Sequence, residues 1–287
     1  MSWDWRGRSA EELERHFNPR VALGDAAANR EVARYVELSA AARKTLPGEY
    51  DLRYGEAEKQ TLDVHRPTKA GAPILLFIHG GFWRRLDKSD HSFIAPAFVE
   101  AGAVFVNLNY DLCPTVTLDD IAREAREGLV WTWRNAARLG GDAARLHVAG
   151  HSAGAHLCAL LLAEDWTRHG LPADAIKGAG LLSGIYETAV VPLISVNQEV
   201  RLDAAMAARC DALSRPPRGP ARPLVSVGGD EPEGWRAQTE AYAAACRGAG
   251  LAPEVLTVAG MNHFTLIHDF AGARGAQHRG MLRAMGL

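Results

Sequence analysis

The sequence predicts an α/β protein with a mostly parallel central sheet and helices on both faces. Near-continuous apolar runs at 73–79 (P-I-L-L-F-I-H) and 103–109 (A-V-F-V-N-L-N) are typical of parallel strands buried on both faces. Amphipathic stretches of helical length separate such runs, and strands that alternate with helices form right-handed βαβ units. With 287 residues, of which 47% are hydrophobic and 23% charged, the chain can bury a sizeable core around one sheet.

The expected elements divide the chain into an N-terminal extension and an alternating body within one domain, 1–287. Residues 1–45 are polar and rich in alanine and arginine, and they predict a helical extension with a helix from Asp25 to Lys44 capped by Asp25. The expected strands of the body are 61–66, 73–79, 103–109, 145–149, 177–183, 223–227 and 254–258. The expected helices are 118–139, 153–166 and 235–247. The irregular stretch 185–222 is long for a connection, so we expect it to form a cap or lid over the site.

Charge and cysteine content narrow the class of protein. The formal net charge of -2 provides no long-range field for nucleic acid or an anionic membrane, so a small-molecule substrate is expected. A homodimer is compatible with the sequence. The first residues lack the apolar stretch of a secretory signal and no window has the length of a membrane span, which favours the cytoplasm. No cofactor or metal is expected, and the scattered cysteines are expected to be free, buried thiols: Cys113, Cys158, Cys210 and Cys246.

The pentapeptide Gly150-His151-Ser152-Ala153-Gly154 matches the pattern G-x-S-x-G. It lies between an apolar strand and an apolar helix, which is the setting of a nucleophile elbow, a sharp turn that exposes the serine oxygen above the sheet. The pattern alone is common. The alternative interpretation is an ordinary strand-to-helix turn in which the serine caps the helix.

A serine nucleophile needs a base, and the base needs an acid to orient it. Where such an elbow occurs, the acid and then the histidine follow the last strands in chain order. His263 comes directly after strand 254–258 and is the expected base, whereas His268 lies in an expected helix. Asp230 is the first acid after strand 223–227 and is the preferred acid, with the adjacent Glu231 as a chemically able alternative.

Adjacent glycines follow strand 73–79 in the run His79-Gly80-Gly81-Phe82-Trp83. Acyl transfer creates an oxyanion that backbone N–H groups stabilise, and glycines let the main chain approach that point closely. We expect the N–H groups of Gly81, Phe82 and Ala153 to form an oxyanion hole.

These motifs resemble the arylformamidase (kynurenine formamidase) branch of the α/β-hydrolase superfamily, close to the hormone-sensitive-lipase-like carboxylesterases. The shared marks are H-G-G-x-W at 79–83, G-H-S-A-G at 150–154 and D-x-P-E at 230–233. The resemblance implies the α/β-hydrolase fold, a metal-independent serine mechanism and an oxyanion hole at Gly81 and Phe82. The chain departs from the branch at Asp111 and at Gly234-Trp235, which are expected to reshape the pocket and not the triad.

The expected activity is hydrolysis of a small aryl-bearing N-formyl amide or short-chain ester through an acyl-enzyme. A general short-chain carboxylesterase is the main alternative, followed by an acyltransferase or a non-catalytic binding protein on the same scaffold. Trp83, Tyr186 and Trp235, with Phe82, are candidates for holding an aromatic ring of the substrate, although each fits a core position equally well.

Overall fold

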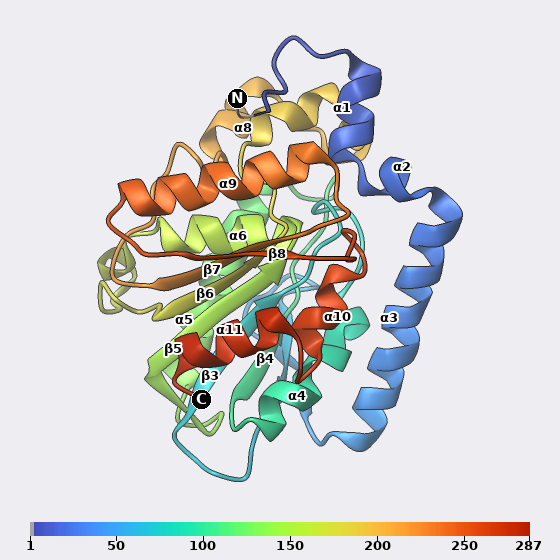
Figure 1. Ribbon diagram of the computed structural model, residues 1–287. Helices are drawn as coiled ribbons and strands as arrows, with labels where there is room; N and C mark the ends of the chain where they lie inside the picture. The colour runs from blue at the N-terminus through green and yellow to red at the C-terminus, as the bar shows by residue number, and fades with distance from the viewer. Residues whose placement is uncertain (1–2) are drawn as a thin grey trace.

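The computed structural model describes residues 3–287 and shows one eight-stranded sheet flanked by helices (Figure 1). The strand order is β1-β2-β4-β3-β5-β6-β7-β8. The strands from β3 to β8 are parallel, whereas β2 pairs antiparallel with β4, and β1 pairs antiparallel with β2. The predicted α/β-hydrolase architecture is confirmed. The strands are β1 (Glu49–Arg53), β2 (Thr61–His65), β3 (Ala72–Ile78), β4 (Val104–Leu108), β5 (Gly141–His151), β6 (Gly178–Leu182), β7 (Arg222–Gly228) and β8 (Glu254–Val258).

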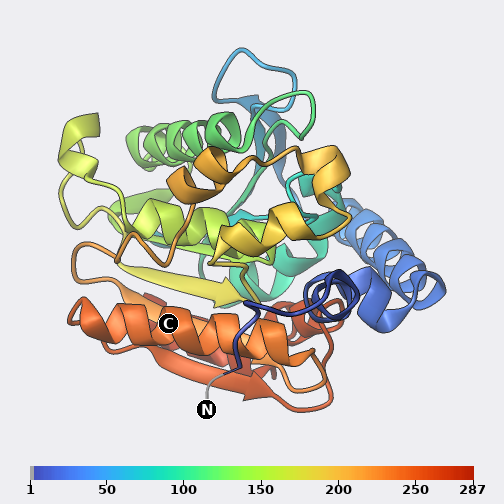
Figure 2. The ribbon, with the colours of Figure 1, turned by 90° about the horizontal axis from the view of Figure 1, so that it is seen from above.

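Helices cover both faces of the sheet. One face carries α5, α6 and α9, and the other carries α4, α10 and α11, as the two ribbon views show (Figures 1 and 2). The N-terminal helices run along one side of the molecule, and α3 packs against η1. The helices are α1 (Ala10–Phe17), α2 (Pro19–Leu23), α3 (Asp25–Thr45), η1 (Lys88–Ile94), α4 (Ala95–Glu100), α5 (Leu118–Asn135), α6 (Ala153–Leu162), η2 (Trp166–His169), η3 (Thr188–Leu193), α7 (Asn197–Val200), α8 (Ala204–Arg209), α9 (Glu233–Gly248), α10 (Leu266–Ala271) and α11 (Ala276–Met285).

Side chains of strand β3 contribute to both apolar clusters of the protein, one on each face of the sheet. Ile74, Leu76 and Ile78 belong to the apolar cluster on the α6 side of the sheet, whereas Leu75 and Phe77 belong to the cluster under α4 and α10. Successive side chains of a strand point to opposite faces, so a continuous apolar run buries both faces of the sheet.

Some details differ from expectation. Strand β1 has no counterpart in the sequence prediction, because E-Y-D-L-R is a largely polar edge strand. The helix from Asp25 is capped by Gly24, so Asp25 is its first residue and not its N-cap. The four cysteines are buried and free, as predicted. None of the helices between residues 3 and 287 is long and apolar enough to cross a bilayer.

The fold brings the candidate residues to one edge of the sheet. Gly81 follows β3, Ser152 follows β5, Ser183 follows β6, Glu231 follows β7 and His263 follows β8. In open α/β sheets, ligands bind beyond the carboxyl ends of the strands, where these loops meet.

Candidate active site

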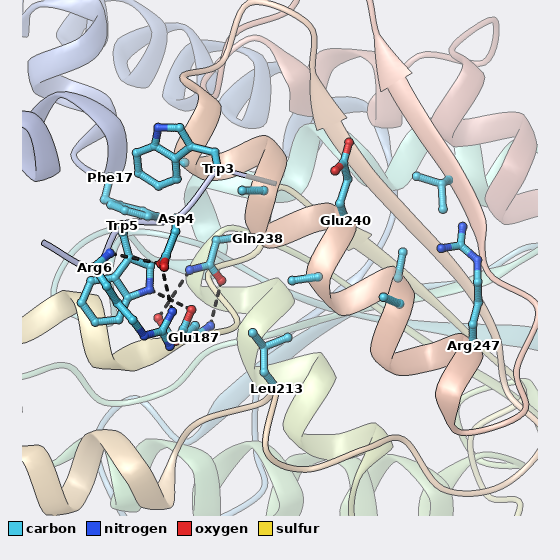
Figure 3. Close-up of a pocket in the computed structure, with 16 residues that line it drawn as sticks. Trp3, Asp4, Trp5, Arg6, Phe17, Glu187, Leu213, Gln238, Glu240 and Arg247 are labelled. Atoms are coloured by element: carbon cyan, nitrogen blue, oxygen red, sulfur yellow. Dashed lines mark hydrogen bonds and ion pairs between the residues drawn. The ribbon is translucent and has the colours of Figure 1, made fainter. Parts of the chain in front are cut away.

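A cavity of about 200 Å³ opens at this edge of the sheet. Ser152 and His263 line it together with Gly81 and Phe82 from the loop after β3. A larger cavity of about 830 Å³ lies between the N-terminal segment and α9 (Figure 3). Its walls include Trp5 and Glu187 but neither Ser152 nor His263. We therefore place the candidate active site in the smaller cavity.

Ser152 adopts the backbone conformation of a nucleophile elbow. Its φ of 56° and ψ of -117° are strained for a residue other than glycine, and its side chain does not cap α6, which removes the alternative interpretation. The flanking glycines are required by close packing. A Cβ at Gly150 would lie 2.3 Å from the Gly154 carbonyl carbon, and a Cβ at Gly154 would lie 2.0 Å from the Ile78 oxygen. Larger residues would therefore displace the turn.

His263 is buried and is held through its Nδ1 atom. That nitrogen lies 2.7 Å from Oε2 of Glu231, and because a carboxylate only accepts, Nδ1–H is the donor. The neutral ring then carries an unprotonated Nε2, which is the form a general base requires. The hydrogen bonds of residues 3–287 include none between Ser152 Oγ and His263, and such contacts often tighten only when substrate binds.

The acid that reaches His263 is Glu231, so the preference for Asp230 is wrong. Asp230 is exposed, whereas Glu231 is 3% exposed and uses both oxygens. Its Oε1 accepts from the N–H of Gly228 at 2.8 Å, and its Oε2 accepts from His263. A fixed, buried carboxylate in contact with Nδ1 can set the tautomer and stabilise an imidazolium.

Ser183 is a polar neighbour that the sequence prediction missed. Its hydroxyl donates to Oε2 of Glu231 at 2.5 Å and lies 3.1 Å from Nδ1 of His263. Its φ of 48° shows that the chain turns sharply directly after β6. The position of Ser183 in the sequence could have identified it. It directly follows a parallel strand that pairs with β5, the strand before Ser152, so its side chain is expected near the site.

Three further residues hold the loop that carries His263. The ring of Trp235 packs against the imidazole, with ring centroids 4.3 Å apart. His151 Nε2 donates to the backbone oxygen of His263 at 2.8 Å, and the hydroxyl of Tyr35 on α3 donates to the oxygen of Phe264. Burial lowers the pKa of His151 well below its usual value, so this ring stays neutral beside His263.

The loop after β3 has the features of an oxyanion hole. Among the described residues, the N–H groups of Gly81, Phe82 and Ala153 find no acceptor within the chain, which leaves them available to a ligand. Gly81 has a φ of 112°, and a Cβ there would lie 2.1 Å from the Arg85 oxygen, so this position requires glycine. Phe82 itself has a φ of 51° and lines the cavity with a 7% exposed side chain.

The other aromatic candidates do not reach the cavity. Trp83, Tyr186 and Trp235 are fully buried, and none of them lines the cavity. Tyr186 stacks on Tyr242 with centroids 4.2 Å apart. The expectation that these three residues hold the substrate ring is therefore corrected, and Trp235 instead supports His263.

The two departures from the resembled branch have different consequences. The Asp111 side chain accepts from the backbone N–H of Lys59 at 3.1 Å and does not line the cavity. A Cβ at Gly234 would lie 3.0 Å from the backbone oxygen of His16, so glycine allows α1 to pack on the start of α9. The next residue, Trp235, touches the imidazole, contrary to the expectation that this departure leaves the triad untouched.

The sheet, the elbow and the buried carboxylate–imidazole pair define an α/β hydrolase of the serine type. Residues 62–174 match the family described as BD-FAE. Over 278 residues the chain is 31% identical to a kynurenine formamidase from Danio rerio, covering 93% of each chain. It is 29% identical over 297 residues to a kynurenine formamidase from Salmo salar, covering 98% of each. The chain belongs to the kynurenine formamidase family and is a hydrolase.

Solved structures agree on the fold. A thermostable carboxylesterase from a metagenomic library superimposes with a TM-score of 0.72 at 18% identity, over 97% of this chain and 98% of that one. Esterase B from Lactobacillus rhamnosis gives a TM-score of 0.73 at 16% identity, over 96% and 95% of the two chains.

Proposed function

We propose that this chain hydrolyses a small aryl-bearing N-formyl amide through an acyl-enzyme formed on Ser152. The observation that carries the proposal is the buried pair of Glu231 and His263 beside Ser152, in a cavity of only about 200 Å³. Pockets that take drug-sized ligands are usually larger, so the cavity favours a compact substrate. The similarity to kynurenine formamidases supports an N-formyl aryl amide as that substrate.

The proposed reaction has two acyl-transfer steps. Ser152 Oγ attacks the carbonyl carbon while His263 Nε2 takes the hydroxyl proton, and the oxyanion receives hydrogen bonds from the N–H groups of Gly81, Phe82 and Ala153. The imidazolium then protonates the departing amine or alcohol. A water molecule, deprotonated by the same imidazole, attacks the acyl-enzyme and releases the acid and free Ser152.

Phe82 gives the proposal a consequence for acyl chain length. Its ring forms a wall beside the oxyanion donors and packs edge-on against Trp83 and Trp235, with centroids 5.8 and 6.2 Å away. A formyl or acetyl group needs little space there, whereas a long acyl chain would meet the ring.

The test compares kcat/KM for N-formylkynurenine and for 4-nitrophenyl acetate, butyrate and octanoate. We expect efficiency to fall at least ~10-fold from acetyl to octanoyl, and Phe82→Gly to recover part of the octanoyl rate. Val196→Ala is the matched control for shortening a side chain of the same cavity at a different place. Val196 lines the cavity from the segment between η3 and α7. Should the wild type prefer octanoate, the small-acyl proposal fails. Hydrolysis of short esters without the formyl amide would favour the carboxylesterase alternative.

A further inference from the structure

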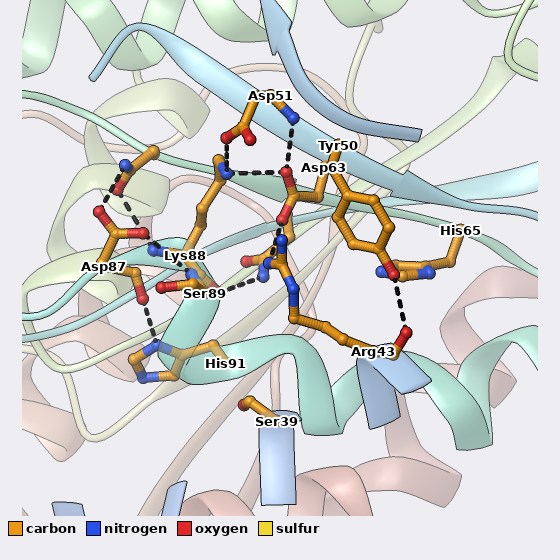
Figure 4. A network of polar contacts seen from close by, with 12 residues as sticks. Ser39, Arg43, Tyr50, Asp51, Asp63, His65, Asp87, Lys88, Ser89 and His91 are labelled. Atoms are coloured by element: carbon orange, nitrogen blue, oxygen red, sulfur yellow. Dashed lines mark hydrogen bonds and ion pairs between the residues drawn. The ribbon is translucent and has the colours of Figure 1, made fainter. Parts of the chain in front are cut away.

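A buried polar network lies behind the loop that carries the proposed oxyanion donors. Lys88 is 3% exposed, and its Nζ lies 2.7 Å from carboxylate oxygens of both Asp63 and Asp51 (Figure 4). The neighbouring Asp87 accepts from Lys59 Nζ at 2.8 Å. None of these residues lines the cavity, so the proposed reaction leaves the network without a role.

Asn109, directly after β4, connects this network to the loop. Its Nδ2 donates to Oδ2 of Asp87 at 2.8 Å, and its Oδ1 accepts from the backbone N–H of Lys88 at 3.3 Å. A carboxylate only accepts and a backbone N–H only donates, so these two partners fix the orientation of the amide. The fixed Oδ1 faces Nε2 of His79 at 3.0 Å.

His79 transmits this position to the loop. The ring is fully buried and stacks on Tyr110, with centroids 4.3 Å apart, and its Nδ1 lies 2.8 Å from the oxygen of Gly80. A neutral imidazole can donate to one of the two facing oxygens and an imidazolium to both. In either state the ring lies between Asn109 Oδ1 and the Gly80 carbonyl oxygen and contacts both.

The Gly80 carbonyl belongs to the same planar peptide unit as the N–H of Gly81. Because the trans peptide is rigid, its C=O and N–H point in opposite directions, and a group that fixes one also aims the other. The loop has little freedom elsewhere, since a Cβ at Gly80 would lie 2.9 Å from the His151 oxygen of the elbow. The direction of the Gly81 N–H therefore depends on where His79 lies, with the Tyr110 hydroxyl, 3.5 Å from the same Gly80 oxygen, as a longer second contact.

We propose that Asn109 is a positioning residue that aims the Gly81 N–H at the oxyanion through His79. This inference rests on the proposed serine mechanism. Asn109 touches no substrate, and its effect should appear in the stabilisation of the tetrahedral state and not in substrate binding.

The experiment compares Asn109→Ala with Asn107→Ala on 4-nitrophenyl acetate. Asn107 is a matched control, because it is a buried amide two residues before Asn109 and donates to the Lys88 oxygen at 2.6 Å. It pairs with Phe77 of β3 and makes no hydrogen bond to His79 among the described residues. Loss of one oxyanion donor costs about 10²–10³ in kcat, and a misaimed donor should cost less, so we expect Asn109→Ala to lower kcat ~10- to 100-fold with little change in KM. Asn107→Ala should keep kcat within about threefold even where it lowers Tm.

Two further readouts separate positioning from general destabilisation. Binding of an aryl trifluoromethyl ketone, which forms a tetrahedral adduct, should weaken in Asn109→Ala in proportion to kcat/KM. Asn109→Asp should recover most of kcat, because two carboxyl groups in contact share a proton and the new side chain can still donate to Asp87 and accept from His79. If Asn109→Ala does not fold, Asn109→Ser takes its place, and its kcat, KM and ketone affinity are compared with those of the wild type in the same way.

The proposal is overturned if Asn109→Ala keeps kcat within about threefold, if its loss equals that of Asn107→Ala, or if ketone binding is unchanged while kcat falls. A failure of the serine mechanism itself would look different, because Ser152→Ala would then retain activity in an otherwise wild-type chain.

Discussion

At the residue scale, two adjacent acids after β7 have opposite environments because of the turn that holds them. The N–H of Asp230 donates to the oxygen of Met261 at 3.0 Å, and its side chain faces solvent. The N–H of Glu231 donates to Gly228 O at 3.2 Å, and its carboxylate folds back to accept the N–H of the same glycine. The turn therefore directs the Glu231 side chain inward, where its second oxygen accepts from His263.

This geometry ranks the two acids by their effect on catalysis. Glu231→Gln should lower kcat by up to about 10⁴, because the amide cannot stabilise the imidazolium and can favour the wrong tautomer of His263. Asp230→Asn is the matched control and should stay within about threefold, as expected for a solvated surface charge. Steady-state kinetics on one ester suffice, and the opposite ranking would return the acid to Asp230.

The sequence predicted some of these residues better than others for physical reasons. Ser152 and His263 were identifiable because a strand–turn–helix motif and a position after the last strand each restrict the candidates to one residue. The choice between Asp230 and Glu231 depends on which way a turn directs neighbouring side chains, and that is a property of three-dimensional contacts such as the Gly228 hydrogen bond.

At the element scale, helix α5 carries a buried acid that couples stability to pH. Burial raises the pKa of Glu124 from its ordinary value of 4.5 to about 7, while its Oε2 accepts from the Asp111 N–H at 2.8 Å. Because the folded-state pKa lies above the ordinary value, folding favours the protonated form. This contribution to stability is complete below pH 4.5 and is lost as the pH rises through about 7.

Glu124→Gln should remove this pH dependence while its amide oxygen still accepts from Asp111. We expect Tm to exceed that of the wild type by ~2–4 °C at pH 8 and to match it near pH 5. Asp119→Asn, at the start of α5 and paired with Arg209 at 2.7 Å, is the control, and its difference in Tm from the wild type should not change between these two pH values. Tm is measured by thermal denaturation from pH 5 to pH 8. A difference in Tm between Glu124→Gln and the wild type that stays the same at every pH would contradict this explanation.

Elements were predictable where burial imposes a clear pattern. The parallel strands β3 and β4 read as apolar runs because both of their faces are covered, and β8 was predicted at its observed limits, Glu254–Val258. Strand β1 was missed because only one neighbour pairs with it and its side chains are partly exposed. The observed strand β5 begins four residues before the predicted one, since its first residues, G-D-A-A-R, include no large apolar side chain that would mark a strand.

At the scale of the whole molecule, the N-terminal helices contribute to the site although they lie far from it in sequence. Tyr35 on α3 holds the loop of His263, and Arg43 on the same helix pairs with the buried Asp63 at 2.9 Å. Asn18 and Pro19 line the cavity. The polar, alanine-rich composition of this region predicted helices but gave no signal for these long-range contacts.

The central claim is that Ser152 is the nucleophile of a single acyl-transfer site, and covalent labelling tests it most directly. The protein is treated with a fluorophosphonate, digested and mapped by mass spectrometry, in parallel with Ser152→Ala. We predict one label per chain, on Ser152, with loss of esterase activity in proportion to labelling, and no label at the site in Ser152→Ala. A label on another serine that tracks the loss of activity, or full activity in the labelled protein, would contradict the account.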